Sequence, residues 1–129
     1  MELRVLAVGD VVGASGLKHL EKHLRGVKRL YGVDFCVVNG ENASVVGLTP
    51  QQADAMLDAG ADVITLGNHT WNRREICPYL DDSPYILRPA NFQPSLPGRG
   101  WGIFETKAGP VAVANLIGRC SMDFSPDNP

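Results

Sequence analysis

The sequence has few cysteines, no excess of positive charge and no long apolar run. Its three cysteines, at positions 36, 77 and 120, are not closely spaced, which argues against a disulfide framework or a structural zinc site. The formal net charge is −2, so we expect no broad basic surface for duplex nucleic acid. No apolar run is long enough to span a bilayer, and no secretory signal is visible. We therefore expect a cytoplasmic protein that binds neither a membrane nor duplex nucleic acid.

The chain has 129 residues, of which 44% are hydrophobic, enough for one domain with a substantial core. Apolar runs alternate with segments of helical periodicity. We expect strands over residues 3–8, 34–38, 61–66 and 85–87, and helices over residues 16–31, 50–59 and 70–80. Residues 101–106 and 111–117 read as two strands of an antiparallel hairpin. The pattern predicts an α/β fold with a mixed β-sheet and flanking helices.

The ends of the first two expected helices carry local signals. Ser15 is the expected N-cap of the first helix, and Gly32 ends it. Thr49 precedes Pro50 and is followed three residues later by Gln52, which is the pattern of a capping box with proline at the first helical position.

Three short polar motifs directly follow three of the expected strands. They are Gly9-Asp10-Val11, Gly40-Glu41-Asn42 and Gly67-Asn68-His69. If these strands pair in one parallel sheet, the polar side chains converge at its carboxyl edge, where ligands bind in open α/β sheets. Oxygen and imidazole groups gathered there suit a divalent metal site. A metal-dependent hydrolase is therefore the first hypothesis.

Each of these side chains also has a plainer interpretation. Asp10 is either a metal ligand or a turn and capping residue, and Glu41 either bridges two metals or caps the next element. Asn42 and Asn68 offer amide oxygens as ligands. His69 can donate or accept a proton near neutral pH, or it can simply complete a turn.

Other polar and aromatic residues carry weaker signals. His19 and His23 are spaced i, i+4, but the residues between them do not form a zinc-protease motif, so we expect a solvated helix face. Trp71, Arg88 and Asn91 lie in loops after strand ends, where they either line a pocket or pack.

The order Gly-Asp, Gly-Glu-Asn and Gly-Asn-His after successive strands resembles the calcineurin-like metallophosphoesterase superfamily. Further stretches are similar to one bacterial branch, the 2',3'-cyclic-nucleotide 2'-phosphodiesterases; these stretches cover residues 8–13, 39–43, 66–71, 87–92 and 115–119. The resemblance implies half of an α/β/β/α sandwich. It also implies that residues 1–129 are the N-terminal part of a single metallophosphoesterase domain, with the C-terminal part absent.

The resemblance also implies roles for the motif residues. Asp10, Glu41 and Asn42 would hold one divalent metal ion, and Glu41 would bridge to a second ion that Asn68 also holds. Iron or manganese is the expected metal. A metal-bound hydroxide would hydrolyse a small phosphodiester such as a 2',3'-cyclic nucleotide, with His69 as general acid. Most of the superfamily has histidine where this chain has Val12, a departure that the bacterial branch shares.

The family's remaining metal ligands are histidines from a later part of a longer chain, and this sequence has no histidine after His69. We therefore expect a weak metal site, exposed sheet edges and apolar surface, and a homo-oligomer or chain exchange that covers them. Two alternatives stay open. One is a non-catalytic regulatory or interaction module that retains the fold; the other is a Rossmann-like nucleotide-binding domain that uses the loop over residues 9–16.

Overall fold

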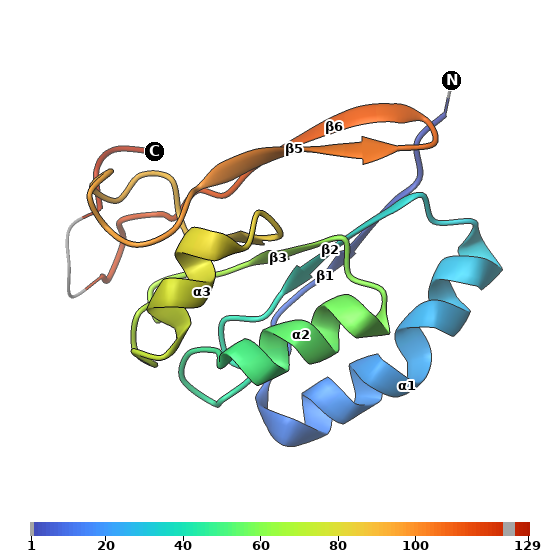
Figure 1. The fold of residues 1–129 in the computed structure, drawn as a ribbon, viewed down its shortest axis with the longest axis horizontal. Helices are drawn as coiled ribbons and strands as arrows, with labels where there is room; N and C mark the ends of the chain where they lie inside the picture. The colour runs from blue at the N-terminus through green and yellow to red at the C-terminus, as the bar shows by residue number, and fades with distance from the viewer. Residues whose placement is uncertain (1, 123–125) are drawn as a thin grey trace.

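A parallel four-stranded sheet forms the centre of the molecule. The computed structural model describes residues 2–122 and 126–129. The strands lie in the order β1 (Val5–Val8), β2 (Phe35–Asn39), β3 (Val63–Thr65) and β4 (Ile86–Leu87), and all pair in parallel (Figure 1). The helices α1 (Gly13–Tyr31), α2 (Pro50–Ala59) and α3 (Ile76–Asp82) connect successive strands. Because every crossover moves one strand in the same direction and such crossovers are right-handed, the helices cover the same face.

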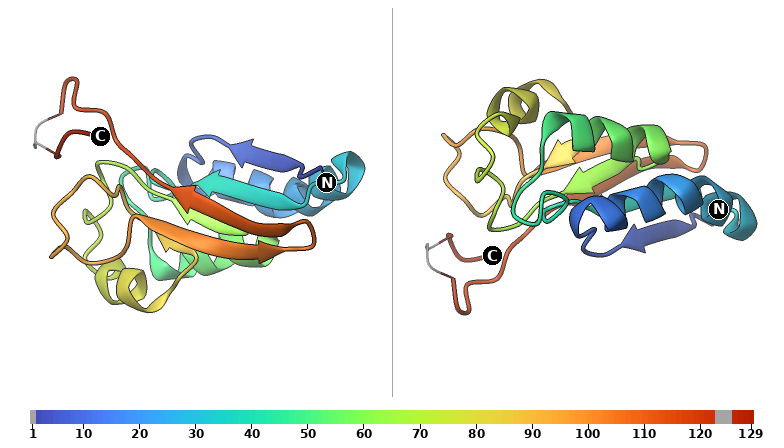
Figure 2. Two further views of the ribbon diagram at one scale, coloured as in Figure 1. Left: turned by 90° about the horizontal axis from the view of Figure 1, so that it is seen from above. Right: turned by 90° about the horizontal axis from the view of Figure 1, so that it is seen from below.

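The other face of the sheet is covered by a hairpin. Strands β5 (Trp101–Thr106) and β6 (Gly109–Ala114) form a two-stranded antiparallel sheet of their own, which lies across the parallel sheet (Figures 1 and 2). The molecule therefore has three layers: helices, parallel sheet and hairpin. This confirms the α/β class with flanking helices and is consistent with half of a metallophosphoesterase sandwich. The sequence pattern did not show that the hairpin forms a separate sheet.

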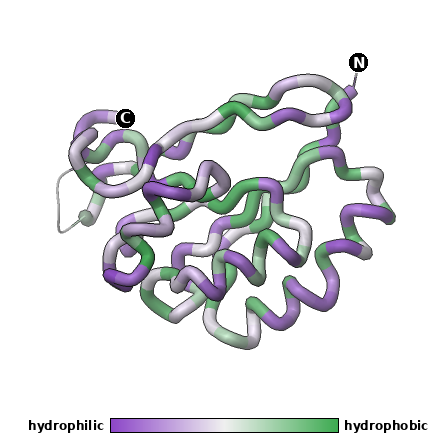
Figure 3. The backbone as a smooth tube through the Cα atoms, viewed as in Figure 1, coloured by the Kyte–Doolittle hydropathy of each residue, from purple (hydrophilic) through white to green (hydrophobic). Residues whose placement is uncertain are grey.

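Two hydrophobic clusters hold the layers together, and alternate residues of the inner strands supply them. On β2, Cys36 and Val38 face the helices, whereas Phe35 packs with Val63, Leu87 and Phe104 beneath the hairpin. Both faces of the inner strands are thus buried, which is why these strands read as continuous apolar runs. Figure 3 shows the resulting hydrophobic centre and the more polar outer helix α1.

The start of α1 differs from the sequence expectation. The helix begins at Gly13 after Val12, which makes no side-chain cap, so the prediction of Ser15 as N-cap is wrong. The physical reason is a long-range bond: the backbone N–H of Gly13 donates to the carbonyl of Asn42 at 3.0 Å. This carbonyl accepts one of the first N–H groups of the helix, which have no partner within the helix. Gly32 ends the helix in a left-handed conformation, as expected.

The capping box of α2 is confirmed. The Thr49 hydroxyl accepts the N–H of Gln52 at 3.2 Å, and the Gln52 side chain accepts the N–H of Thr49 at 3.0 Å. By contrast, α3 starts six residues after the expected residue 70, because turns occupy the intervening segment: Thr70 N–H donates to the Gly67 carbonyl, and Asn72 N–H donates to the His69 carbonyl.

Strand β6 runs over residues 109–114 instead of the expected 111–117. It ends where Asn115 turns toward the parallel sheet. The Asn115 amide group donates to the carbonyls of Leu66 at 2.7 Å and Leu87 at 3.0 Å. This residue therefore ties the hairpin to the ends of β3 and β4.

Apolar side chains are exposed on the outward face of the hairpin and on the edge strand β1, as expected from the sequence. Trp101 is 62% exposed, Ile103 64% and Val5 53%. Among the residues described, no helix has both the length and the apolar character needed to cross a bilayer.

One polar contact joins α3 to α2 and predicts a pH-dependent stability. The Tyr79 hydroxyl donates to Asp54 Oδ1 at 2.7 Å. Burial, followed by this bond, raises the pKa of Tyr79 to about 12 from its ordinary value of 10. Because the folded-state pKa is the higher one, the stabilisation is fully present below pH 10 and is lost as the pH rises toward 12.

We therefore expect Tyr79→Phe to lower the free energy of unfolding at pH 7 by about 1 kcal/mol, as for the loss of one hydrogen bond. The difference from the unmodified protein should shrink between pH 10 and 12. Urea unfolding across this range measures it, with the exposed Tyr31→Phe variant as the matched control. Equal losses for the two variants would contradict the assignment.

Candidate functional site

The three sequence motifs meet at the carboxyl edge of the parallel sheet. The strand register pairs Val8 with Val38 and Val38 with Ile64, so β1, β2 and β3 end at nearly the same level. Asp10 follows β1, Glu41 and Asn42 follow β2, and Asn68 and His69 follow β3. The convergence predicted from the sequence is therefore found in the structure.

The His69 ring lies between two amide groups. Its Nδ1 is 3.3 Å from Asn42 Oδ1, and its Nε2 is 3.2 Å from Asn68 Nδ2. The Asn42 amide also donates from Nδ2 to Asp10 Oδ1 at 2.9 Å. A continuous chain of polar contacts thus runs from the end of β1 through the β2 loop to the end of β3.

Glu41 also belongs to this cluster. Its Oε1 accepts the backbone N–H of His69 at 2.7 Å and lies 3.5 Å from the ring Nδ1. The Glu41 side chain is only 13% exposed. It packs directly over Gly67, where an added Cβ would lie 2.5 Å from Glu41 Oε2. Glycine is required at this position so that the carboxylate can approach the backbone closely.

Asp10 has an uncommon backbone conformation, with a φ of 34°. Left-handed backbone is tolerated by aspartate better than by most residues, but it still costs free energy and is typical of functional sites. A tertiary contact holds it there: the N–H of Val11 donates to the Asn39 carbonyl at 3.0 Å. The end of β2 therefore holds the backbone next to Asp10.

The donors at this edge suit a divalent cation in kind. Asp10 and Glu41 provide carboxylates, and Asn42 and Asn68 provide amide groups. Within residues 2–122 and 126–129, neither carboxylate pairs with a lysine or arginine, so their negative charge is available to a cation. In the same described ranges, no three His, Cys, Asp or Glu side chains are grouped to hold a metal ion. The cluster therefore offers donors of the kind that a metal ion prefers, without a group of three such side chains in the described part of the chain.

The remaining polar candidates lie outside this cluster of contacts. The rings of His19 and His23 lie with centroids 4.3 Å apart on the exposed side of α1, as expected of a solvated face. Arg88 and Asn91 are buried and hold loops: Arg88 Nη1 donates to the Pro89 carbonyl, and Asn91 Nδ2 donates to the carbonyl of Ile117. Burial lowers the pKa of Arg88.

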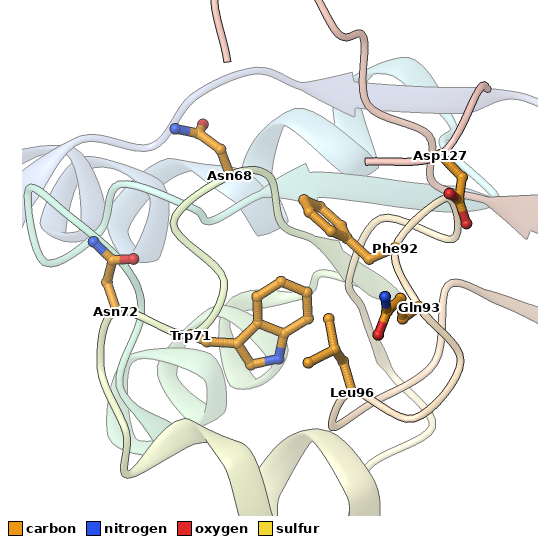
Figure 4. A pocket seen from close by; sticks show the side chains of 7 residues that line it. All are labelled: Asn68, Trp71, Asn72, Phe92, Gln93, Leu96 and Asp127. Atoms are coloured by element: carbon orange, nitrogen blue, oxygen red, sulfur yellow. The ribbon is translucent and has the colours of Figure 1, made fainter. Parts of the chain in front are cut away.

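A pocket of about 400 Å³ opens beside Asn68 (Figure 4). Its apolar lining is Trp71, Phe92 and Leu96, and its polar lining is Asn68, Asn72, Gln93 and Asp127. Of the three residues left open between pocket and packing roles, only Trp71 lines this pocket. Asn68, a candidate from the sequence, lines it as well. No sequence pattern indicated a pocket role for the remaining lining residues, because only the tertiary fold brings their segments together: Asn72, Phe92, Gln93, Leu96 and Asp127.

The contact between Gly67 and Glu41 gives a direct test of the site's geometry. We expect Gly67→Ala to push the Glu41 carboxylate off the His69 amide and to lower the free energy of unfolding by about 1.5–3 kcal/mol, as for the loss of a hydrogen bond to a charged group. The matched control is Gly9→Ala, since a Cβ at Gly9 would meet nothing within 4 Å. Urea unfolding and the NMR shift of the His69 amide measure both effects. Identical behaviour of the two variants would show that Gly67 is not needed for this approach.

The chain is similar in sequence and in fold to known proteins. Residues 6–129 match the family described as YmdB-like protein. The 2',3'-cyclic-nucleotide 2'-phosphodiesterase of Bacillus subtilis strain 168 is 41% identical over 118 residues, which are 91% of this chain and 45% of that protein.

Two crystal structures have closely similar folds. A hypothetical protein from Thermus thermophilus superposes with a TM-score of 0.87 at 34% identity, over 98% of this chain and 49% of its own. A phosphatase from Mycoplasma pneumoniae superposes with a TM-score of 0.88 at 27% identity, over 98% and 47% of the two chains. The chain thus spans about half the length of the relatives it matches. These matches confirm the resemblance to the bacterial phosphodiesterases, and the chain belongs to the family of YmdB-like proteins.

Proposed function

We propose that this chain carries the N-terminal part of the active site of a metal-dependent phosphodiesterase that acts on a small phosphodiester such as a 2',3'-cyclic nucleotide. One observation carries the proposal: Asn42 joins Asp10 to the His69 ring, and the backbone N–H of His69 donates to Glu41, so that one polar cluster forms at the carboxyl edge of the sheet. The name of the 41% identical relative supports the substrate class.

Four residues of the sheet edge would hold two divalent cations. Asp10, Glu41 and Asn42 would bind one, and Glu41 and Asn68 the other, with iron or manganese as the expected metal. When bound, such ions neutralise a phosphate group and lower the pKa of water. Because these donors are two carboxylates and two amides, high affinity would depend on ligands beyond these four residues.

His69 would protonate the leaving oxygen of the phosphodiester. A bond from Nδ1 to Asn42 Oδ1 leaves Nε2 to accept from Asn68 Nδ2. Protonation at Nε2 then requires Asn68 Nδ2 to move out of hydrogen-bond distance. The proton on His69 and the orientation of Asn68 are therefore coupled, and the ring is held in place on its other side while this exchange occurs.

A non-catalytic module that retains the fold is the second candidate. It is favoured by one observation: in the described part of the chain, no group of three or more His, Cys, Asp or Glu side chains is placed to hold a metal. Such a module would contain little metal and would not hydrolyse a phosphodiester.

The test uses the full-length product of the gene that encodes this chain. We expect His69→Ala to lower the turnover of 2',3'-cyclic AMP by about 10²–10⁴-fold, the range for loss of a general acid, with metal content unchanged. The contrasting variant, Glu41→Gln, should lower metal content as well as turnover. Mass spectrometry of bound metal and a phosphate-ester assay measure both.

Two results would contradict these roles. If His69→Ala loses metal in proportion to its activity, His69 is a ligand instead of an acid. If the unmodified protein neither binds divalent metal nor hydrolyses the cyclic nucleotide, the second candidate is correct.

A further inference from the structure

The geometry points to a nucleobase site in the pocket formed by Trp71, Phe92 and Leu96, with the phosphodiester of the same nucleotide at its Asn68 end. This inference rests on the proposed function and deepens it by naming the part of the substrate that the chain recognises. The pocket volume of about 400 Å³ lies within the usual range of small-molecule sites, roughly 300–1,000 Å³.

The pocket is continuous with the polar cluster because Asn68 belongs to both. The Asn68 side chain lines the pocket, and its Nδ2 lies 3.2 Å from His69 Nε2. A ligand that fills the pocket therefore ends next to the group proposed to transfer the proton. In a 2',3'-cyclic nucleotide, only the ribose separates the base from the phosphodiester, so one molecule can occupy both places.

The aromatic wall of the pocket is rigid. The rings of Trp71 and Phe92 pack edge to face, with centroids 5.1 Å apart and an interplanar angle of 88°. The indole Nε1–H of Trp71 donates to the Pro97 carbonyl at 3.2 Å, which fixes the ring. Figure 4 shows the two rings turned toward each other with Leu96 beside the indole. A fixed aromatic face is the surface on which single bases stack.

The polar lining decides which way round a nucleotide binds. Asn72 and Gln93 carry amides that can both donate to and accept from a base edge. Asp127 carries a carboxylate, which repels phosphate and accepts from an exocyclic amino group. Its backbone is held in place, because Asp127 N–H donates to the Asn91 carbonyl and Asn91 Nδ2 donates to the Asp127 carbonyl. The phosphate therefore belongs at the Asn68 end and the base near Asp127.

The side chain of Asp127 makes the site selective among bases. Adenine, cytosine and guanine each carry an exocyclic amino group that can donate to a carboxylate, whereas uracil does not. We expect adenosine to bind at least tenfold more tightly than uridine. Purines also present the larger surface for stacking on Trp71.

The binding test follows the indole N–H signals of Trp71 and Trp101 by ¹⁵N NMR in the full-length protein. Titration with adenosine should shift the Trp71 signal and leave Trp101 unchanged, since Trp101 lies on the hairpin and does not line the pocket. Ribose 5-phosphate, which lacks a base, should bind at least tenfold more weakly. The Trp101→Phe variant assigns the signals and should bind adenosine as the unmodified protein does.

Two variants examine the contacts separately. Trp71→Leu should weaken adenosine binding about tenfold or more. Asp127→Asn replaces an exposed side chain and should reduce the preference for adenosine over uridine at least threefold, whether or not the Trp71 variant folds.

Either of two results would overturn the inference. One is that adenosine leaves the Trp71 signal unshifted, which is also the result expected if another part of a longer chain fills the pocket. The other is that ribose 5-phosphate binds as tightly as adenosine. Its failure is distinguishable from failure of the proposed function. Methyl ribofuranoside 2',3'-cyclic phosphate is a diester without a base. If it is hydrolysed as efficiently as 2',3'-cyclic AMP, only the proposed base site is contradicted. If neither diester is hydrolysed, the proposed function is contradicted, and the indole shifts still measure whether the pocket binds a base.

Discussion

The close approach of the Glu41 carboxylate to Gly67, and its bond to the backbone N–H of His69, is the contact on which this site depends. A carboxylate that is largely buried is costly unless its oxygens are bonded. Here the backbone after β3 supplies the hydrogen-bond donor for the Glu41 side chain after β2. The contact therefore joins the loops after β2 and β3 and holds the backbone of His69, whose ring contacts the Asn42 and Asn68 amides.

The layers of the fold hold the strand ends that make this contact. The right-handed crossovers leave one face of the parallel sheet without helices, and the hairpin fills that face through Phe104, which packs on Phe35 with ring centroids 5.5 Å apart. Asn115 then bonds the carbonyls of Leu66 and Leu87, close to where the motif residues begin. The strand ends that carry the site are thus fixed from the helical side by packing and from the hairpin side by hydrogen bonds.

Much of this could be predicted because its signals are local. Each polar motif stands directly after its apolar strand, and the capping box of α2 lies within four residues. What could not be predicted depends on distant partners. The start of α1 is decided by the Asn42 carbonyl, far along the chain from Gly13. The pocket is assembled from loop residues such as Trp71, Phe92 and Asp127, whose spacing in the sequence has no period. Arg88 and Asn91 pack because their donors meet backbone carbonyls, which sequence patterns do not reveal.

The left-handed backbone at Asp10 has a consequence for how this protein tolerates change. Glycine would adopt the φ of 34° without a steric penalty, and it would also remove one of two carboxylates gathered at the same edge. Relief of strain and relief of charge repulsion would both favour the folded state, while the oxygen donor would be lost. Under the proposed function, stability and activity would therefore favour different residues at this position, as in other proteins where stability is traded for activity.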